Sequence, residues 1–470
     1  MKAQEQMFKG MFEGPIIPMI VRIGLPILIG NLLNYVYLII DTYYIAMLDP
    51  TSSALLAGTG LLFPLFFIFE AIASSLAVGL STVTGRLIGE RRFEECKSLG
   101  ISGVMMALVL GIPFILVCYL FGPDLINLLA GSGLSPEAKT YGLEFLYSLA
   151  PALIFMILIQ VYGGILLGEG LTHVLAIAFT LMTVLNLILD PIMIFALGLG
   201  VTGAGLSTSI AMCFAFLYVV RFLQKGKSRI PLTFSLSRFN KRIVKEIVRI
   251  GLPQLLMTVS IYGITVVYNK IITTNFSENA MNAWTLTGRF DQILIIPVIA
   301  VAGATTVFAS QNFGRNQLER IKKTLNVSTL FVFGMCTVIA ALYVLLAPWL
   351  FSMFTSIPEV VELSVRQALI ISFTFGFMAV TWISGSFFQA TGRPMPAVII
   401  LYIRVLIIIA LGLYFIYGLD MGMNGIFISM AIGNALSLPI AFLWVKGHLK
   451  KVKFTSIFDK HSPIANEQRG

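Results

Sequence analysis

Long runs of apolar residues recur along the whole chain and are separated by short polar segments. The runs are continuous instead of alternating with polar residues, which favours helices over the strands of a barrel. A helix of about 20 residues crosses the roughly 30 Å hydrocarbon layer of a bilayer. Because lipid offers the backbone no hydrogen-bond partner, each crossing segment must pair its own polar groups. The pattern predicts twelve membrane-spanning helices, at residues 16–47, 54–86, 99–121, 140–167, 172–197, 203–223, 246–274, 280–312, 325–352, 363–390, 396–417 and 424–446.

The composition agrees with an all-α integral membrane protein. Of the 470 residues, 57% are hydrophobic and only 11% are charged, and the mean hydropathy is +0.92. A water-soluble domain needs a larger share of charged residues for its surface, whereas a chain surrounded by lipid does not. The composition therefore excludes a soluble globular protein.

The net charge of +10 is distributed unevenly over the predicted loops. With twelve spans both termini lie on one side, and that side receives nearly all the basic residues, including nine between Arg221 and Arg249. The opposite side holds only Lys139, Lys270 and Arg366. By the positive-inside rule we expect both termini in the cytoplasm and the protein in the cell membrane. The charge thus encodes orientation and does not indicate nucleic-acid binding.

Sequence landmarks in the first half recur in the second. The sequence RIGLP occurs at 22–26 and again at 249–253, which is 227 positions later (249 − 22). Three further pairs of landmarks match with slightly smaller offsets: Gly89 with Gly314, Gly163 and Gly170 with Gly385 and Gly392, and Gly200 and Gly203 with Gly422 and Gly425. Duplicated halves are typical of transporters. We predict two pseudo-symmetric bundles of six helices, residues 1–230 and 231–470, which face a central cleft and work by alternating access.

Ionisable residues inside the predicted spans are few. A charged side chain at the centre of a membrane helix costs about 2.5–3.5 kcal/mol on insertion scales, so such residues usually mark a cavity or an ion path. They are Asp41, Glu70, Asp190, Arg289, Asp291 and Arg404. Three of these four carboxylates, Asp41, Glu70 and Asp190, lie in the first half.

Two of these carboxylates have polar neighbours on their own helix face. Asn34, Tyr37 and Asp41 are spaced by three and four residues, as on one side of a helix, and Asn186 and Asp190 are four apart. Burial favours the neutral form of a carboxyl group, and a second carboxylate nearby favours it further. Such a pocket would hold a proton or bind Na⁺ through oxygen ligands. The alternative is that Asp41 and Asp190 lie at helix ends and are merely solvated.

The other charged residues are possible accessories with competing structural interpretations. Glu70 has no polar neighbour on its own helix. Arg289 and Asp291 are two residues apart and cannot share a helix face, so each would pair with another helix. Arg404 would neutralise one of the carboxylates. No catalytic constellation such as HExxH or a Ser/His set occurs, so we predict no catalytic residues and no enzyme activity.

Several motifs resemble those of the MATE (multidrug and toxic compound extrusion) transporters, on the DinF-like side of the family, over essentially the whole chain. They are Gly24-Leu25-Pro26 with Asp41-Thr42, the loop Gln311-Asn312-Phe313-Gly314, the segment from Gln389 to Pro394, and the segment from Asn186 to Pro191 followed by Gly203-Ala204-Gly205. The resemblance implies export of organic, often cationic, compounds in exchange for H⁺ or Na⁺.

The resemblance also implies a cation site in the first half. Its residues correspond to Asp41, Asn186, Asp190 and Thr208, which would be the Na⁺ ligands if Na⁺ is the coupling ion. Tyr37 matches a tyrosine of the family, and Asn34 stands where some relatives carry glutamine. Glu70 departs from the family pattern.

The sequence therefore favours a multidrug efflux antiporter. The alternatives are a lipid-linked oligosaccharide flippase of the same superfamily, which would carry more cationic residues in its cavity, and a membrane-embedded enzyme. As partners we expect small organic substrates such as drugs and cationic dyes, and the lipid bilayer, with no nucleic acid and no cofactor beyond the coupling ion H⁺ or Na⁺. We expect a monomer.

Overall fold

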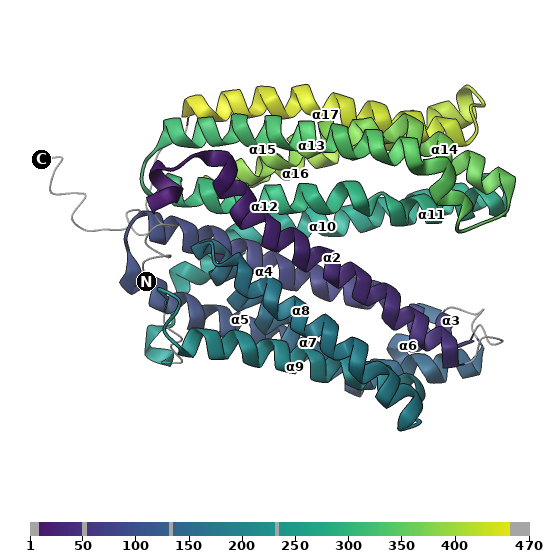
Figure 1. Ribbon diagram of the computed structural model, residues 1–470, viewed down its shortest axis with the longest axis horizontal. Coiled ribbons are helices and arrows are strands. Elements are labelled where there is room, and N and C mark those ends of the chain that lie inside the picture. Colours follow the sequence, from purple (N-terminus) through teal and green to yellow (C-terminus); the bar gives the residue numbers. More distant parts are fainter. Residues whose placement is uncertain (1–8, 49–53, 131–134, 231–234, 452–470) are drawn as a thin grey trace, which may run out of the picture. The chain divides into compact units, whose positions relative to one another are not determined.

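The computed structural model describes residues 9–48, 54–130, 135–230 and 235–451, and within these ranges the regular elements are helices. Figure 1 shows their order along the chain. The helices are α2 (Ile16–Leu48), α3 (Ala54–Gly60), α4 (Phe63–Gly89), α5 (Phe93–Leu120), α6 (Gly122–Ala130), α7 (Pro136–Glu169), α8 (Thr172–Pro191), α9 (Gly200–Gln224), α10 (Lys241–Asn275), α11 (Glu278–Phe290), α12 (Gln292–Gly314), α13 (Leu318–Ser352), α14 (Pro358–Ile371), α15 (Phe375–Ala390), α16 (Met395–Leu413) and α17 (Met423–Lys451).

The twelve predicted spans are all present. In the described part of the chain, 12 helical segments are long and apolar enough to cross a membrane. Some begin before their apolar run does. The helix predicted from residue 325 starts at Leu318, because the polar turn that contains Glu319 and Arg320 continues the same helix. The protein is therefore a multi-pass, all-α membrane protein.

The predicted repeat is confirmed by irregular backbone features that recur at the predicted offsets. A short π-helix follows α8 at Ile192–Ala196 and another follows α16 at Tyr414–Gly418, 222 positions later (414 − 192). The loop glycines Gly170 and Gly392 both have positive φ angles, of 85° and 72°. Since a left-handed residue at a helix end favours glycine, these positions explain why the two glycines match in the sequence.

The chain forms two compact units, and the first helix of each half is divided between them. One unit contains Leu25–Leu255, and the other contains Lys2–Gly24 together with Leu256–Ser456. The RIGLP motifs lie at these divisions. A Cβ placed on Gly251 would lie 2.7 Å from the Ser75 carbonyl oxygen, within the first unit. The matching Cβ on Gly24 would lie 3.3 Å from the Ala300 carbonyl oxygen, within the second. The repeated motif thus allows close helix packing twice.

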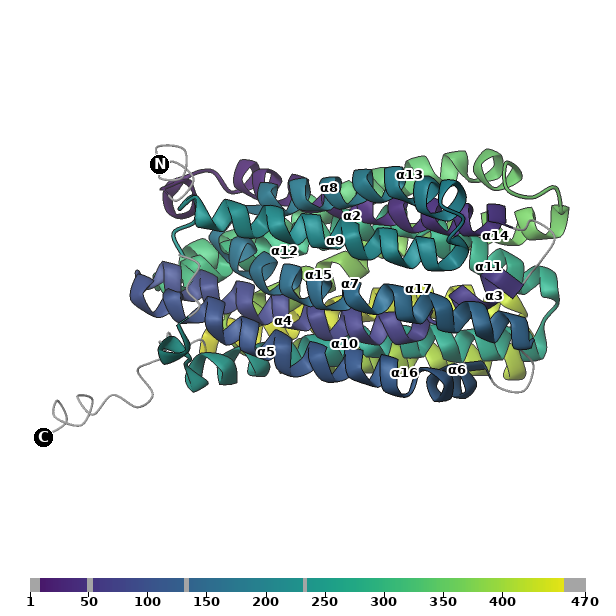
Figure 2. The ribbon, with the colours of Figure 1, turned by 90° about the horizontal axis from the view of Figure 1, so that it is seen from below.

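In the first unit, α7 packs against α3, α4, α5 and α9, and α9 packs against α8. Figure 2 shows α7, α8 and α9 side by side. Helix α2 lies against α8, where a Cβ on Gly30 would lie 3.1 Å from the Phe179 ring. The Thr183 hydroxyl donates to the Leu33 carbonyl oxygen at 3.5 Å. This arrangement brings polar positions of α2, α8 and α9 together.

In the second unit, α15 packs against α12, α13 and α17, and α16 packs against α17. In Figure 1, α13, α15 and α17 run side by side in green to yellow. A buried core that includes Tyr268, Phe351 and Phe427 joins these helices to α10.

Candidate functional site

A buried polar cluster lies where α2, α8 and α9 meet in the first unit. Helix α2 contributes Tyr37 and Asp41, α8 contributes Asn186 and Asp190, and α9 contributes Ser207 and Thr208. Asp190 is 0% exposed and Asp41 is 9% exposed. The four-residue spacings of Tyr37 and Asp41 and of Asn186 and Asp190 place each of these pairs on one side of its helix, and Ser207 and Thr208 are adjacent. The sequence therefore directs six polar side chains into one apolar bundle.

Thr208 and Asn186 connect the three helices. The Thr208 hydroxyl lies 3.1 Å from the Tyr37 hydroxyl of α2 and 3.2 Å from Asn186 Nδ2 of α8. Asn186 Nδ2 also lies 3.1 Å from Asp190 Oδ1. Ser207 donates its hydroxyl hydrogen to the same Asp190 oxygen. One oxygen of Asp190 is thus held by two donors, and Thr208 of α9 bridges Tyr37 of α2 and Asn186 of α8.

Three oxygen atoms of the cluster are left without a hydrogen-bond partner among the described residues. They are Asp41 Oδ1, Asn186 Oδ1 and Asp190 Oδ2, and all three are buried. Asp41 and Asp190 are close enough to interact electrostatically. A buried polar oxygen without a partner is unfavourable. A shared proton would supply one partner, and a hard cation, which prefers carboxylate and carbonyl oxygens, would supply several. The residues therefore fit either H⁺ or Na⁺.

The structure brings together five of the six residues predicted for this site: Tyr37, Asp41, Asn186, Asp190 and Thr208. The sixth, Asn34, is exposed, and in the described part of the chain no hydrogen bond joins it to the cluster. The alternative in which the two aspartates are solvated at helix ends is wrong, because both are buried. Ser207 was not predicted. Its signal in the sequence is its place beside Thr208, one turn after Gly203-Ala204.

Glu70 lies apart from this cluster, between α4 and α7. Gln160 of α7 donates from Nε2 to Glu70 Oε1 at 3.0 Å. Glu70 has no polar neighbour on its own helix because its partner is 90 positions away on another helix. A single amide donor fits a packed polar contact, and among the described residues no second carboxylate accompanies Glu70 there.

The three charged residues that the sequence placed within spans of the second half lie in different surroundings. Asp291 lies between the end of α11 and the start of α12 and accepts a hydrogen bond of 3.3 Å from Gln367 Nε2. Arg289 is exposed on the last turn of α11. Arg404 lies beside Tyr268, and none of the ion pairs of the described residues joins it to a carboxylate. The prediction that Arg404 neutralises a carboxylate is therefore wrong.

Replacing Thr208 by valine tests how the cluster is held together. Valine keeps the side-chain shape but removes the hydroxyl that links Tyr37 to Asn186. Because both partners remain buried, we expect the free energy of unfolding to fall by about 1–3 kcal/mol, which corresponds to the loss of buried hydrogen-bond partners. Thermal unfolding in detergent measures the change.

Thr180→Val is the matched control. Thr180 is exposed on α8, and its hydroxyl bonds only to the Ala176 carbonyl oxygen of its own helix, at 2.8 Å. We expect Thr180→Val to leave the melting temperature almost unchanged. Equal melting temperatures for the two variants would show that Thr208 does not connect the helices.

The sequence pattern of the MatE family matches residues 26–192 and 253–414. The multidrug export protein MepA of Staphylococcus aureus (strain MSSA476) is 24% identical over 435 residues, which cover 92% of this chain and 94% of that protein.

Solved structures agree with this similarity. The crystal structure of MATE in complex with MaL6 has a TM-score of 0.88 and 25% identity, covering 95% of this chain and 99% of that one. The outward-facing conformation of a multidrug resistance MATE family transporter of the MOP superfamily has a TM-score of 0.86 and 26% identity, covering 93% and 96%. The family pattern also matches twice, once in each half, with its starts at Pro26 and Pro253. The chain belongs to the MatE family of membrane transporters.

Proposed function

We propose that the protein is a multidrug efflux antiporter, which exports amphipathic and cationic organic compounds in exchange for H⁺ or Na⁺. The observation that carries the proposal is the cluster of α2, α8 and α9, in which Asp41, Asn186 and Asp190 each leave a buried oxygen unpartnered. The relatives named above are an export protein and transporters, not enzymes, which agrees with this function.

The chemistry of the cluster suggests how ion binding drives transport. When the cation is bound, the free oxygens of Asp41 and Asp190 gain a partner and the repulsion between the two carboxylates falls. When the cation leaves, both changes are reversed. The two conditions therefore favour different packings of α2 against α8 and α9. A ligand shifts a conformational equilibrium by its difference in affinity for the two states, so cation binding would favour the state that releases the drug.

We also propose an orientation and an assembly state. We place the protein in the cell membrane with both termini in the cytoplasm, because the basic residues gather on that side. It would act as a monomer, since the cluster takes all of its residues from one chain. The flippase alternative is less well supported, because Arg289 and Arg404 are the only basic residues that the sequence predicts deep within spans.

Export from vesicles with controlled gradients tests the proposal. The purified protein is reconstituted in liposomes, and the movement of ethidium is followed under a pH gradient, a Na⁺ gradient or neither. We expect transport to depend on one of the two gradients, because ethidium movement is coupled to the opposing ion. Ethidium movement that is equal in all three conditions would contradict antiport.

A further inference from the structure

Arg404 occupies the middle of a membrane-spanning helix and faces the interior of the second unit. It is the tenth of the 19 residues of α16. Its neighbours one turn away on either side, Leu401 and Ile408, are 5% and 3% exposed. Arg404 therefore lies on the buried face of α16, not on a lipid-facing side.

The guanidinium of Arg404 has no anionic partner in the part of the chain that the structure describes. Its Nε atom is buried and makes no hydrogen bond. Tyr268 of α10 is close enough to interact electrostatically with Arg404, and its hydroxyl donates to the Ile408 carbonyl oxygen at 3.3 Å. Asp291, the carboxylate within the predicted span 280–312, accepts its hydrogen bond from Gln367 and not from Arg404.

An unpaired charge at this depth is costly and usually marks a functional position. Arginine cannot lose its proton to avoid the cost. The residue as a whole is only partly buried, so part of its side chain stays exposed. Its planar set of donors matches a carboxylate or another oxyanion, to which it can make two parallel hydrogen bonds. An anionic group would thus supply the partner that the protein does not.

We propose that Arg404 is a binding site for the acidic group of transported compounds, so that the substrates include organic anions and zwitterions as well as cations. This inference rests on the proposed export function and specifies its substrate class. A compound with both a cationic and an acidic group would then be favoured over one that carries the cation alone.

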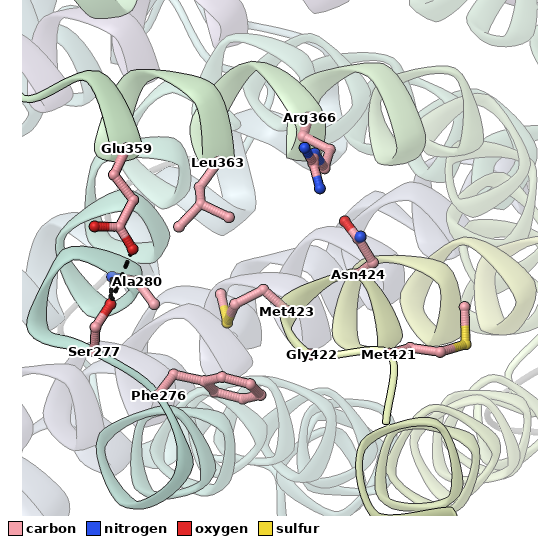
Figure 3. Close-up of a pocket in the computed structure, with 10 residues that line it drawn as sticks. All are labelled: Phe276, Ser277, Ala280, Glu359, Leu363, Arg366, Met421, Gly422, Met423 and Asn424. Carbon is pink, nitrogen blue, oxygen red and sulfur yellow. Dashed lines mark hydrogen bonds between the residues drawn. The ribbon is translucent and has the colours of Figure 1, made fainter. Parts of the chain in front are cut away.

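A second arginine of the same unit offers a rival site. A cavity of about 280 Å³ is lined by residues that follow α10, by residues of α11 and α14, and by the start of α17. In Figure 3, Arg366 and Asn424 point toward one another in it. Glu359 lies on the far side and accepts a hydrogen bond of 3.3 Å from the Ser277 hydroxyl. Arg366, however, is already bound to Glu362 at 2.6 Å. Its charge is neutralised, so we expect it to contribute little to anion binding.

The binding of two related dyes tests the proposal without requiring transport. Rhodamine B carries a carboxylate, whereas its ethyl ester carries the same cation without the acid. With the detergent-solubilised protein, fluorescence anisotropy gives the dissociation constant of each dye. For Arg404→Gln we expect rhodamine B to bind about 10-fold to 100-fold more weakly, because a charge-assisted hydrogen bond is lost. The ester should bind within about 2-fold of the wild type.

Three further measurements make the result specific. Arg404→Lys keeps the charge but not the planar fork, so its affinity for rhodamine B should lie between those of the wild type and Arg404→Gln. Arg366→Gln should leave both dyes unaffected. In the wild type, benzoate should compete with rhodamine B and not with the ester, and this measurement remains decisive even if Arg404→Gln fails to fold.

The proposal is overturned if Arg404→Gln weakens both dyes equally or neither, if Arg366→Gln alone weakens rhodamine B, or if benzoate competes with both dyes or with neither. Failure of the export function is recognised separately. In that case the dyes would bind as expected, but no gradient would drive ethidium across the vesicle membrane.

Discussion

Asp41→Asn and Asp190→Asn are each expected to lower gradient-driven export at least about 10-fold. A charge-assisted interaction of about 1.5–3 kcal/mol is lost in each variant, and each 1.4 kcal/mol corresponds to a factor of ten. Asparagine has nearly the same shape as aspartate but can neither release a proton at the cluster nor supply a negative charge for Na⁺. The measurement is ethidium export from liposomes under the gradient that drives the wild type.

The local structure is expected to survive these substitutions. At position 190, the amide oxygen of asparagine can still accept hydrogen bonds from Ser207 and Asn186, the donors that hold Asp190 Oδ1. The melting temperatures should therefore stay close to that of the wild type, and the loss should concern coupling. Asp124→Asn, which changes an exposed carboxylate in the first turn of α6, is the matched control and should export normally. Undiminished export by Asp41→Asn and Asp190→Asn would place the coupling site elsewhere.

The sequence was sufficient to predict the fold because each membrane-spanning helix corresponds to a long apolar run in the sequence. Apolar runs longer than the bilayer is thick leave few alternatives to helices. The repeat was recognisable because its landmarks are glycines with a backbone role, such as Gly170 and Gly392 at positive φ. Helix starts were less predictable. Polar turns such as the one at Glu319 continue a helix beyond the membrane without any apolar signal.

The site was predictable in part, because spacing identifies residues that share a helix face but not what faces them. Tyr37 and Asp41 meet polar groups of α8 and α9, whereas one turn earlier Asn34 remains exposed. The polar residue of α8 next to this turn of α2 is Thr183. Its hydroxyl donates to the Leu33 carbonyl oxygen and not to the Asn34 side chain. Gln160, the partner of Glu70, comes from a distant segment, and no local pattern connects the two. The unpaired state of Arg404 could be seen only once its neighbours were placed.

Replacing Gly164 by alanine is expected to cause a large loss of stability, because α4 and α7 pack with their backbones in close contact. A Cβ on Gly164 would lie 2.5 Å from the Ala77 carbonyl oxygen and 2.9 Å from its Cα. One turn later, a Cβ on Gly168 would lie 2.6 Å from the Ser81 carbonyl oxygen. Small residues four apart are typical of closely packed membrane helices. Since backbone atoms cannot rotate away, α4 and α7 must separate, at a cost of about 1–3 kcal/mol for overpacking.

Thermal unfolding of Gly164→Ala and Gly100→Ala in detergent separates this packing effect from helix propensity. Gly100 lies in α5, and a Cβ there would meet no atom within 4 Å. Alanine favours a helix over glycine by up to about 1 kcal/mol, so Gly100→Ala should melt at or above the wild-type temperature, and Gly164→Ala should melt several degrees lower. If both variants melt alike, the seam between α4 and α7 tolerates a methyl group and the packing is looser than these distances require. Because α7 also packs against α9, we expect the separation of α4 from α7 to shift α9. The contacts of Thr208 in the cluster that joins α2 to α8 should then weaken.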